Sequence, residues 1–343
     1  MALLWMDGFE GGGSSGYLNA YVARRYDWTG ADVVNNSYPW AAGQCGGSAV
    51  NMYATYNFCG TPPLTTDRTL IVGFAFRPNS ASTNWLVRMC SDNTVGVSLE
   101  YYVSGSTREL RVYRGGTLLG TTSTGNAFQI NRWHWIELKV YCDDTAGTIE
   151  VRYGGRTIYT FTGDTQADAS INYHNTLYFT RGSTIDNFYV CDSTGSRNND
   201  FLGPVKITTI TPNAAGDAAH WDASGGGEHH TYVDDFPLAN DDSDYVESAV
   251  ADRKELWHYT DATDIGDTIH AVQVVTLARA TDAQCSDLKT LAKSGGGYES
   301  EDSAQTVGVD YSEVVRIMEA QPGGSDAWTA AALNSYQFGV KVG

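Results

Sequence analysis

Residues 132–141 read RWHWIELKVY, residues 148–153 read TIEVRY, and the dipeptide Gly154-Gly155 follows. In TIEVRY, apolar and charged side chains alternate with a period of two, which is typical of a strand with one buried face. Two adjacent glycines can adopt the positive φ angles that a tight hairpin turn requires. The sequence therefore predicts an antiparallel hairpin whose second strand covers residues 156–161.

The hydrophobic phase changes inside residues 132–141. Trp133 and Trp135 occupy odd positions, whereas Ile136, Leu138 and Val140 occupy even ones. Because the side chains of a regular strand alternate between two faces, these two sets would point in opposite directions. We expect a β-bulge or a strong local twist to explain the shift.

The same strand pattern extends in both directions from this hairpin. Residues 109–114 (ELRVYR), the dipeptide Gly115-Gly116 and residues 117–121 predict a second hairpin of the same design. Further short strands are expected at residues 69–77, 84–89, 95–103, 175–181 and 184–191. No long helical pattern interrupts them, and many short strands at even spacing indicate a β-sandwich or jelly roll.

A polar, turn-rich segment at residues 192–204 divides the chain. We therefore place one domain at residues 1–203 and a second at residues 204–343. In the second domain we expect strands at residues 205–211, 268–280, 307–318 and 337–342, long loops at 216–244 and one helical turn at 329–334. The predicted fold class is all-β, with two β-sandwich (jelly-roll) domains in tandem and little helix.

The charge of the chain limits its partners. The formal net charge is −18, and residues 205–343 carry 23 acidic but only 8 basic side chains. Such a field repels phosphate backbones, so we expect no nucleic-acid partner. No stretch approaches the roughly 20 apolar residues of a membrane helix, and Asp7 and Glu10 interrupt the apolar run after Met1. We expect no membrane partner and no secretory signal, and hence a protein that stays in the cytoplasm where it is made.

Residues 132–191 carry a family resemblance. The succession W-x-W-I-E-L-K-V, G-T-I-E-V-R-Y-G-G and T-I-D-N-F-Y-V resembles the concanavalin A-like, laminin-G-type jelly-roll domains. LWMDGFE at residues 4–10 looks like the first strand of those domains. The resemblance covers the first domain. It implies a jelly-roll fold and says little about function.

A second resemblance covers the linker and the second domain. Its motifs are IDNFYVCD at residues 185–192, NNDFLGPVKITTITP at 198–212, GDAAHW at 216–221 and AWTAAALNSYQFGVKV at 327–342. They are similar to a domain common in tailed-phage virion proteins, often attached to a laminin-G-like first domain. The resemblance implies a structural component of the virion, in capsid decoration, neck or tail, without a position in the particle.

The sequence lacks the catalytic motif of the glucanases that share the concanavalin-like fold. Their E-x-D-x-x-E strand motif aims carboxylates into the groove as nucleophile and acid, and it does not occur here. Glu137 and Glu150 lie in predicted strands, but Lys139 and Arg152 follow at i+2. We interpret both glutamates as surface charges on the solvent face. We predict no catalytic residue, no cofactor and no enzyme activity.

Asp7 and Asp186 are candidate metal ligands, because lectins of this fold can bind calcium through clustered Asp and Asn side chains. Asp143 and Asp144 are further possible oxygen ligands. Asp7, the adjacent Asp143 and Asp144, and Asp186 lie far apart in sequence. The alternative role for Asp186 is to tie down a neighbouring loop. The sequence therefore assigns no metal site.

Two other groups of residues have open alternatives. His220, His229 and His230 lie in an acidic loop but match no metal-binding motif, so we interpret them as loop residues of which one or two satisfy buried backbone groups. Cys45 and Cys59 flank one short loop and are the first candidates for a disulfide, although scattered cysteines of a cytosolic chain are usually free thiols.

Trp28, Trp40 and Trp85 lie outside the most regular predicted strands. Aromatic rings stack on sugars, so these residues suggest a glycan platform. The alternative is core packing or a protein interface.

The sequence thus predicts a non-enzymatic structural protein of a tailed-phage particle. It would decorate or cement the capsid, or reinforce the neck or tail, in contact with other virion proteins and as a homo-oligomer. The alternative is a glycan-binding adhesin (receptor-binding protein) that uses the jelly-roll domain to contact a host surface glycan. A third hypothesis is a glycoside hydrolase. We expect the protein in the virion, after assembly in the host cytoplasm.

Overall fold

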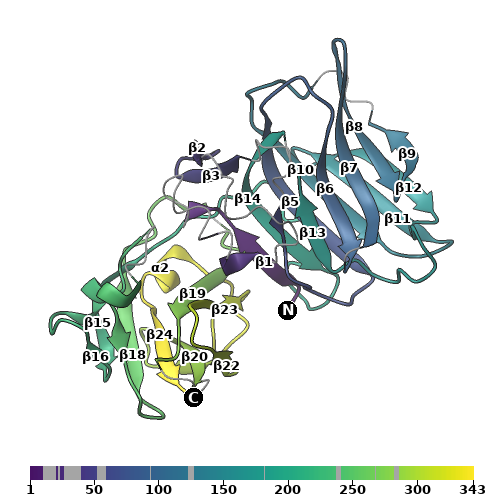
Figure 1. Cartoon of the computed structure of the whole chain (residues 1–343). Helices are drawn as coiled ribbons and strands as arrows, with labels where there is room; N and C mark the ends of the chain where they lie inside the picture. The colour runs from purple at the N-terminus through teal and green to yellow at the C-terminus, as the bar shows by residue number, and fades with distance from the viewer. Residues whose placement is uncertain are drawn as a thin grey trace. The chain divides into compact units, whose positions relative to one another are not determined.

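The computed structural model describes residues 1–10, 21, 24–26, 40–51, 59–92, 94–122, 127–180, 182–236, 241–266, 268–281 and 286–343. The chain divides into two compact units, Met1–Ile207 and Thr208–Gly343. The regular secondary structure of both units is almost entirely antiparallel strand (Figure 1), which confirms the predicted all-β fold class.

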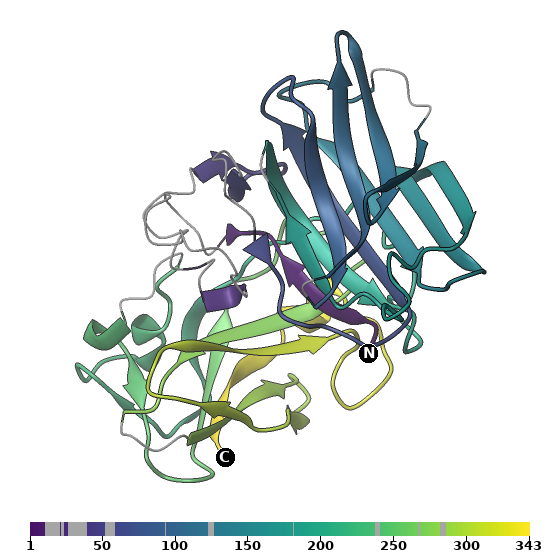
Figure 2. The same ribbon diagram turned by 45° about the vertical axis from the view of Figure 1, so that its right-hand side comes forward.

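The first unit is a β-sandwich of two antiparallel sheets, seen as separate layers of ribbon in Figure 2. The eight-stranded sheet has the order β12 (Arg156–Gly163), β11 (Gly147–Tyr153), β10 (His134–Tyr141), β5 (Thr69–Pro78), β14 (Ser183–Asp192), β3 (Ser48–Asn51) and β2 (Trp40–Ala42), and β1 (Leu3–Asp7) pairs with β14. The six-stranded sheet has the order β4 (Cys59–Gly60), β13 (Thr176–Phe179), β6 (Asn84–Ser91), β7 (Thr94–Ser104), β8 (Thr107–Arg114) and β9 (Thr117–Thr121). The chain crosses between the two sheets several times, with β6 to β9 consecutive in the six-stranded sheet and β10 to β12 consecutive in the eight-stranded one.

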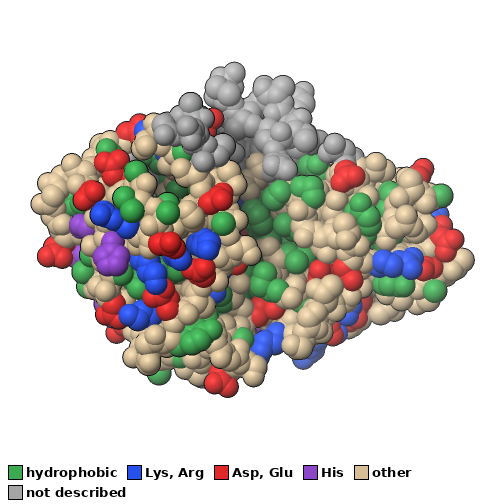
Figure 3. All heavy atoms as spheres, turned by 90° about the horizontal axis from the view of Figure 1, so that it is seen from below, with side chains coloured by type: hydrophobic (Ala, Val, Ile, Leu, Met, Phe, Trp, Pro, Cys, Tyr) green, Lys and Arg blue, Asp and Glu red, His purple; other side chains and the backbone are tan. Residues whose placement is uncertain are grey.

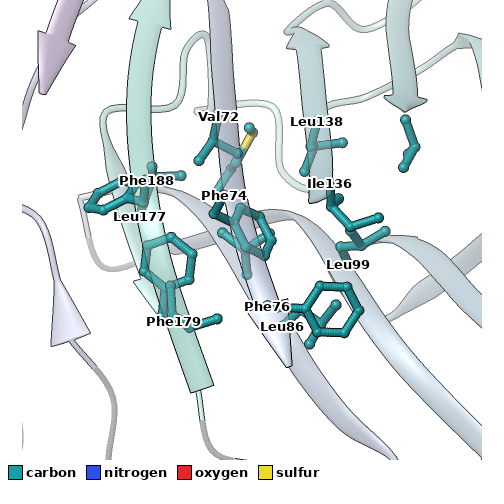
Figure 4. Packing of buried hydrophobic residues seen from close by; sticks show 14 of the residues in the cluster. Val72, Phe74, Phe76, Leu86, Leu99, Ile136, Leu138, Leu177, Phe179 and Phe188 are labelled. Atoms are coloured by element: carbon teal, nitrogen blue, oxygen red, sulfur yellow. The ribbon is translucent and has the colours of Figure 1, made fainter. Parts of the chain in front are cut away.

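The core of the first unit lies between these sheets. Phe74 of β5 contacts Phe179 of β13 edge-on, with 5.2 Å between the ring centroids. Phe179 contacts Phe188 of β14 in the same way, with 4.9 Å between the ring centroids. Figure 4 shows these rings together with Leu99 and Ile136, which come from opposite sheets. Each buried aromatic or aliphatic side chain of this kind stabilises the fold by roughly 1.5–3 kcal/mol relative to an exposed one.

The two predicted hairpins are present, as β8–β9 and β11–β12. Gly154 and Gly155 have φ values of 55° and 80°, so the second turn uses the left-handed conformation that favours glycine. The β-bulge expected within residues 132–141 is wrong for the paired residues 134–141, and the alternative, a strong local twist, stays a prediction. β10 pairs with both β11 and β5 without a register shift. Trp135 lies on the outer face, opposite to the core residue Ile136 that follows it in the strand. There it stacks on Tyr189, with 6.2 Å between the ring centroids.

The predicted strand at residues 205–211 is also wrong, because these residues form no strand and the next strand, β15 (Pro212–Ala219), begins after them. The preceding segment contacts the eight-stranded sheet through its backbone amides. The N–H of Ile207 donates to Asn187 Oδ1 at 2.7 Å, and the N–H of Gly203 donates to Glu137 Oε1 at 2.8 Å. Side-chain acceptors thus replace the ladder partners that a strand would need.

The second unit is a smaller β-structure. Its main sheet has the order β15, β18 (Lys254–Tyr259), β24 (Gln337–Val342), β20 (Ser286–Lys293) and β21 (Glu299–Glu301), with β22 (Gln305–Val307) on β20. The two-stranded sheets are β19 (Val272–Ala278) with β23 (Ser312–Met318) and β16 (Asp222–Ala223) with β17 (Val246–Glu247). The short helices are η2 (His229–Tyr232), η3 (Asp241–Ser243) and α2 (Ala330–Leu333).

The core of the second unit is built around Trp328. Its ring contacts Tyr336 at 4.8 Å, and its indole N–H donates to the carbonyl of Met318 at 2.9 Å. The helical turn predicted at residues 329–334 is confirmed as α2, whose N-terminus is capped by the Thr329 hydroxyl. Among the described residues, no helix is long and apolar enough to cross a membrane.

Candidate functional site

The outer face of the six-stranded sheet carries the candidate site. On β6, β7 and β8 the side chains alternate, so that Leu99 and Val112 point into the core while their neighbours point outward. The outward residues come together because the strands pair in register. Trp85 lies opposite Glu100, and Ser98 lies between Arg88 and Tyr113. We call Trp85, Arg88, Glu100 and Tyr113 the aromatic face.

The two rings of the aromatic face meet across the central strand β7. Trp85 and Tyr113 lie 4.9 Å apart, centroid to centroid, with an interplanar angle of 74°. Ser98 of β7 is only 1% exposed. A small side chain at this position leaves room for the large rings of both neighbouring strands to contact each other.

Charged groups border the rings. The guanidinium of Arg88 lies over Trp85, 4.8 Å from the ring centroid, a cation–π geometry. The Tyr113 hydroxyl donates to Glu100 Oε2 at 3.1 Å. Burial, followed by this carboxylate, raises the pKa of Tyr113. Burial lowers the pKa of Arg88. Arg111 of β8 also lies beside Tyr113 and opposite Glu100, and it pairs with Glu109 at 3.2 Å. The face therefore combines aromatic surface with carboxylate and guanidinium groups in a setting that is partly shielded from water.

Of the tryptophans suggested for a glycan platform, Trp85 is placed on this face. Trp28 and the side chain of Trp40 lie outside the described residues. Arg88, Glu100 and Tyr113 were not predicted as site residues from the sequence. The alternation of side chains in residues 95–103 and 109–114 shows which sheet face Glu100 and Tyr113 occupy. Their closeness to Trp85 depends on the register of β6 on β7, which contains shifts and does not follow from the sequence pattern.

Asp7, one of the candidate metal ligands, is already saturated by donors from its own unit. Oδ2 accepts from Arg25 Nε at 3.0 Å and from the Tyr26 hydroxyl at 2.6 Å. Oδ1 accepts from the Tyr21 hydroxyl at 2.6 Å and from the N–H of Phe9 at 2.7 Å. This carboxylate acts as a structural anchor for the residues that follow β1.

Asp186, the other candidate ligand, holds a loop, which was the alternative role considered for it. Its Oδ2 accepts the N–H of Gln44 at 2.6 Å, and its Oδ1 accepts the N–H of Asn187 at 2.7 Å. Burial, and then the charges of Glu10 and Asp7, raise its pKa to about 7. Glu10 holds the same loop through the N–H of Ser48 at 2.9 Å.

Asp143 closes a turn instead of joining these carboxylates, accepting the N–H groups of Thr145 and Ala146 at 3.0 and 2.8 Å. Its neighbour Asp144 is exposed. Within the part of the chain that the structure describes, no group of three or more His, Cys, Asp or Glu side chains is placed to hold a metal ion.

The interpretation of Glu137 as a surface charge is wrong, because this residue is 0% exposed. Its Oε1 accepts the Tyr189 hydroxyl at 2.6 Å and the N–H of Gly203. The segment after β14 covers this part of the sheet, with Phe201 beneath the guanidinium of Arg152 at 4.0 Å. Glu150 behaves as expected, since it is partly exposed and pairs with Arg152 at 2.8 Å.

Of the three histidines in the acidic loop, His229 contacts a buried carboxylate of the second unit through its side chain. His229 Nδ1 lies 2.8 Å from Glu255 Oε1, and the N–H of Trp221 donates to Glu255 Oε2 at 3.0 Å. His220 offers its carbonyl to Arg253 at 3.0 Å. Figure 3 shows acidic, basic and histidine side chains mixed on the visible surface of this unit.

The predicted Cys45–Cys59 disulfide remains a prediction. Cys45 is exposed, whereas the side chain of Cys59 lies outside the described atoms. Cys90 and Cys142 are buried, and burial raises the pKa of these thiols to about 12 and about 11. Thiols of this kind are unreactive at neutral pH.

The chain is similar in structure to several solved proteins. A galectin from Caenorhabditis elegans is 13% identical, with 41% of this chain and 94% of the galectin covered and a TM-score of 0.31. A heptameric pentraxin from Limulus polyphemus is 12% identical, with 41% and 74% covered and a TM-score of 0.33. An alginate lyase is 10% identical, with 55% and 92% covered and a TM-score of 0.35. At such low identities and TM-scores, these likenesses carry no argument about function.

No protein-family model matches the chain. No curated protein matches it.

Proposed function

We propose that the first unit binds carbohydrate through the aromatic face. The observation that carries the proposal is the contact between Trp85 and Tyr113 across β7, with Glu100 and Arg88 at the border of the rings. All four side chains are partly exposed. The face lies on the paired strands β6, β7 and β8, so its residues are held in place before a ligand arrives.

This combination suits a sugar for physical reasons. Partly exposed rings offer apolar surface to the C–H groups of a pyranose. A carboxylate accepts hydrogen bonds from sugar hydroxyls, and a guanidinium donates them in a fixed planar geometry. Pre-placed side chains on a sheet lower the entropy cost of binding.

A glycan array followed by calorimetric titration tests this proposal. Trp85→Ala removes the ring that contacts both Tyr113 and Arg88, and we expect at least a tenfold loss of affinity for the best array ligand. Trp133→Ala is the matched control, because Trp133 is also partly exposed and also lies beneath an arginine, Arg77, at 5.0 Å. Binding unchanged in Trp85→Ala, or weakened equally in both variants, would contradict the proposal.

We also propose that binding proceeds without catalysis. Of the two strand carboxylates considered for a hydrolase, Glu137 is covered by the segment after β14, and Glu150 pairs with Arg152. Neither is available as half of an acid–nucleophile pair. Incubation of the bound glycan with the protein, followed by mass spectrometry, should return the glycan intact. Release of shorter sugars would overturn this part of the proposal.

A second proposal concerns where the chain operates. The similarity of residues 185–221 and 327–342 to a domain of tailed-phage virion proteins supports a component of a phage particle. Immunogold labelling of particles with an antibody to residues 205–343 tests it. Label over the head would support a decoration role and label at the tail an adhesin. Unlabelled particles would contradict the proposal.

A further inference from the structure

Arg88 differs in its partners from the basic side chains of the first unit that form ion pairs. Arg25, Arg68, Arg114 and Lys139, for example, each form an ion pair with an aspartate. Among the described residues, Arg88 has no carboxylate partner, and its Nε is buried without a hydrogen-bond acceptor. What it does contact is the ring of Trp85.

The position of Arg88 makes this cation costly for the folded protein. It projects from β6 opposite Ser98, with Tyr178 of β13 on its other side in the register. Neither neighbour carries a charge at neutral pH. Burial disfavours the charged form, as the lowered pKa of Arg88 shows. A buried donor without an acceptor destabilises the folded state, and more so when it is charged.

A ligand anion would compensate the charge of this guanidinium by accepting hydrogen bonds from its terminal N–H groups, which are not among the buried unpartnered atoms as Nε is. The nearest carboxylate of the aromatic face, Glu100, lies opposite Trp85 and accepts from Tyr113. Glu100 therefore does not pair with the guanidinium of Arg88, which stays at the border of the rings. Arginine presents parallel N–H donors that match the two oxygens of a carboxylate, and such charge-assisted pairs are about twice as strong as neutral hydrogen bonds.

We propose that the aromatic face selects acidic saccharides and that Arg88 binds the carboxylate of a uronic or sialic acid residue while the rings contact its pyranose. This inference rests on the proposed carbohydrate-binding function and adds the class of ligand. Arg88 is therefore a specificity-determining residue, separate in role from the rings that bind any sugar.

The test uses two matched probes, a hexagalacturonate and the same hexasaccharide after chemical reduction of its carboxyl groups. Calorimetry on the whole chain should give at least tenfold tighter binding of the acidic probe. Arg88→Gln should abolish this difference, with a much smaller loss of affinity for the reduced probe, through the hydrogen bonds that the guanidinium donates to sugar hydroxyls. Arg77→Gln, which removes the arginine over Trp133, should leave both affinities unchanged. A sulfated hexagalactan serves as a third probe and should bind no better than the reduced one.

The outcomes separate the two proposals. Equal affinity of wild-type protein for the acidic and reduced probes, equal loss of both in Arg88→Gln, or preference for the sulfated probe would overturn the acidic-sugar inference and leave carbohydrate binding intact. A glycan array without any hit would overturn the proposed function itself. Arg88→Gln should remain folded by circular dichroism, because Arg88 forms no ion pair among the described residues.

Discussion

The protonation of Asp186 gives a quantitative prediction for stability. The side chain is 1% exposed, and burial raises its pKa from 3.8 to about 7. The folded state therefore holds this proton more tightly than the unfolded state does. Between about pH 4 and pH 7, unfolding releases a proton, so the free energy of unfolding falls as the pH rises. At 1.36 kcal/mol per pKa unit, the loss reaches about 4 kcal/mol.

Asp186→Asn isolates this contribution, because asparagine does not titrate. We expect the unfolding free energy of the wild type, relative to that of the variant, to fall by about 4 kcal/mol between pH 4 and pH 8. Urea unfolding followed by tryptophan fluorescence at one-unit pH steps measures it. Asp143→Asn is the control. The N–H groups of Ala146 and Thr145 hold the pKa of Asp143 below its usual range. The Asp143→Asn substitution should therefore change the pH dependence of stability only at pH values below the measured range. Parallel pH profiles for the wild type and Asp186→Asn would refute the reasoning.

Three further changes test other parts of the structure, each by urea unfolding. Tyr189→Phe removes the hydroxyl bound to buried Glu137 and should cost about 2–3 kcal/mol; a cost below 0.5 kcal/mol would show that this contact is dispensable. Leu99→Ala should cost about 2–5 kcal/mol, since the residue is fully buried, and a neutral effect would contradict the packing of the first core. Thr329→Ala should cost about 1 kcal/mol, through loss of the bond to the N–H of Ala332; unchanged stability would contradict the cap.

Local sequence patterns predicted the elements whose causes are local. The hairpin turn at Gly154 and Gly155 followed from alternation and from the φ freedom of glycine, and its geometry is confirmed. α2 followed from a short run of helix-forming residues within 329–334. In both cases, neighbours in sequence determine the conformation.

The errors came from contacts between distant segments. The alternation of apolar and charged side chains in its strand predicted an exposed Glu137. A segment far along the chain covers it instead, and the N–H of Gly203 in that segment donates to its carboxylate. The odd position of Trp135 looked like a bulge, although Tyr189 of β14 provides its packing partner on the outer face. The sequence does not state which residues cover a sheet face, since that depends on tertiary packing.

The candidate site was predictable only in part. Trp85 was selected as an aromatic residue outside the regular strands, but its contact with Tyr113 depends on pairing across three strands. Whether Arg88 has a carboxylate partner depends on which side chains the neighbouring strands place beside it. Such features follow from the register of a sheet, which short patterns fix only weakly.

Hydrogen–deuterium exchange with and without the best array glycan tests the central claim most directly. Binding at the aromatic face should slow exchange in peptides from β6, β7 and β8, at residues 84–91, 94–104 and 107–114. Peptides from β10 and β11 in the other sheet should be unaffected. Protection confined to the eight-stranded sheet or to the second unit would contradict the assignment of the site.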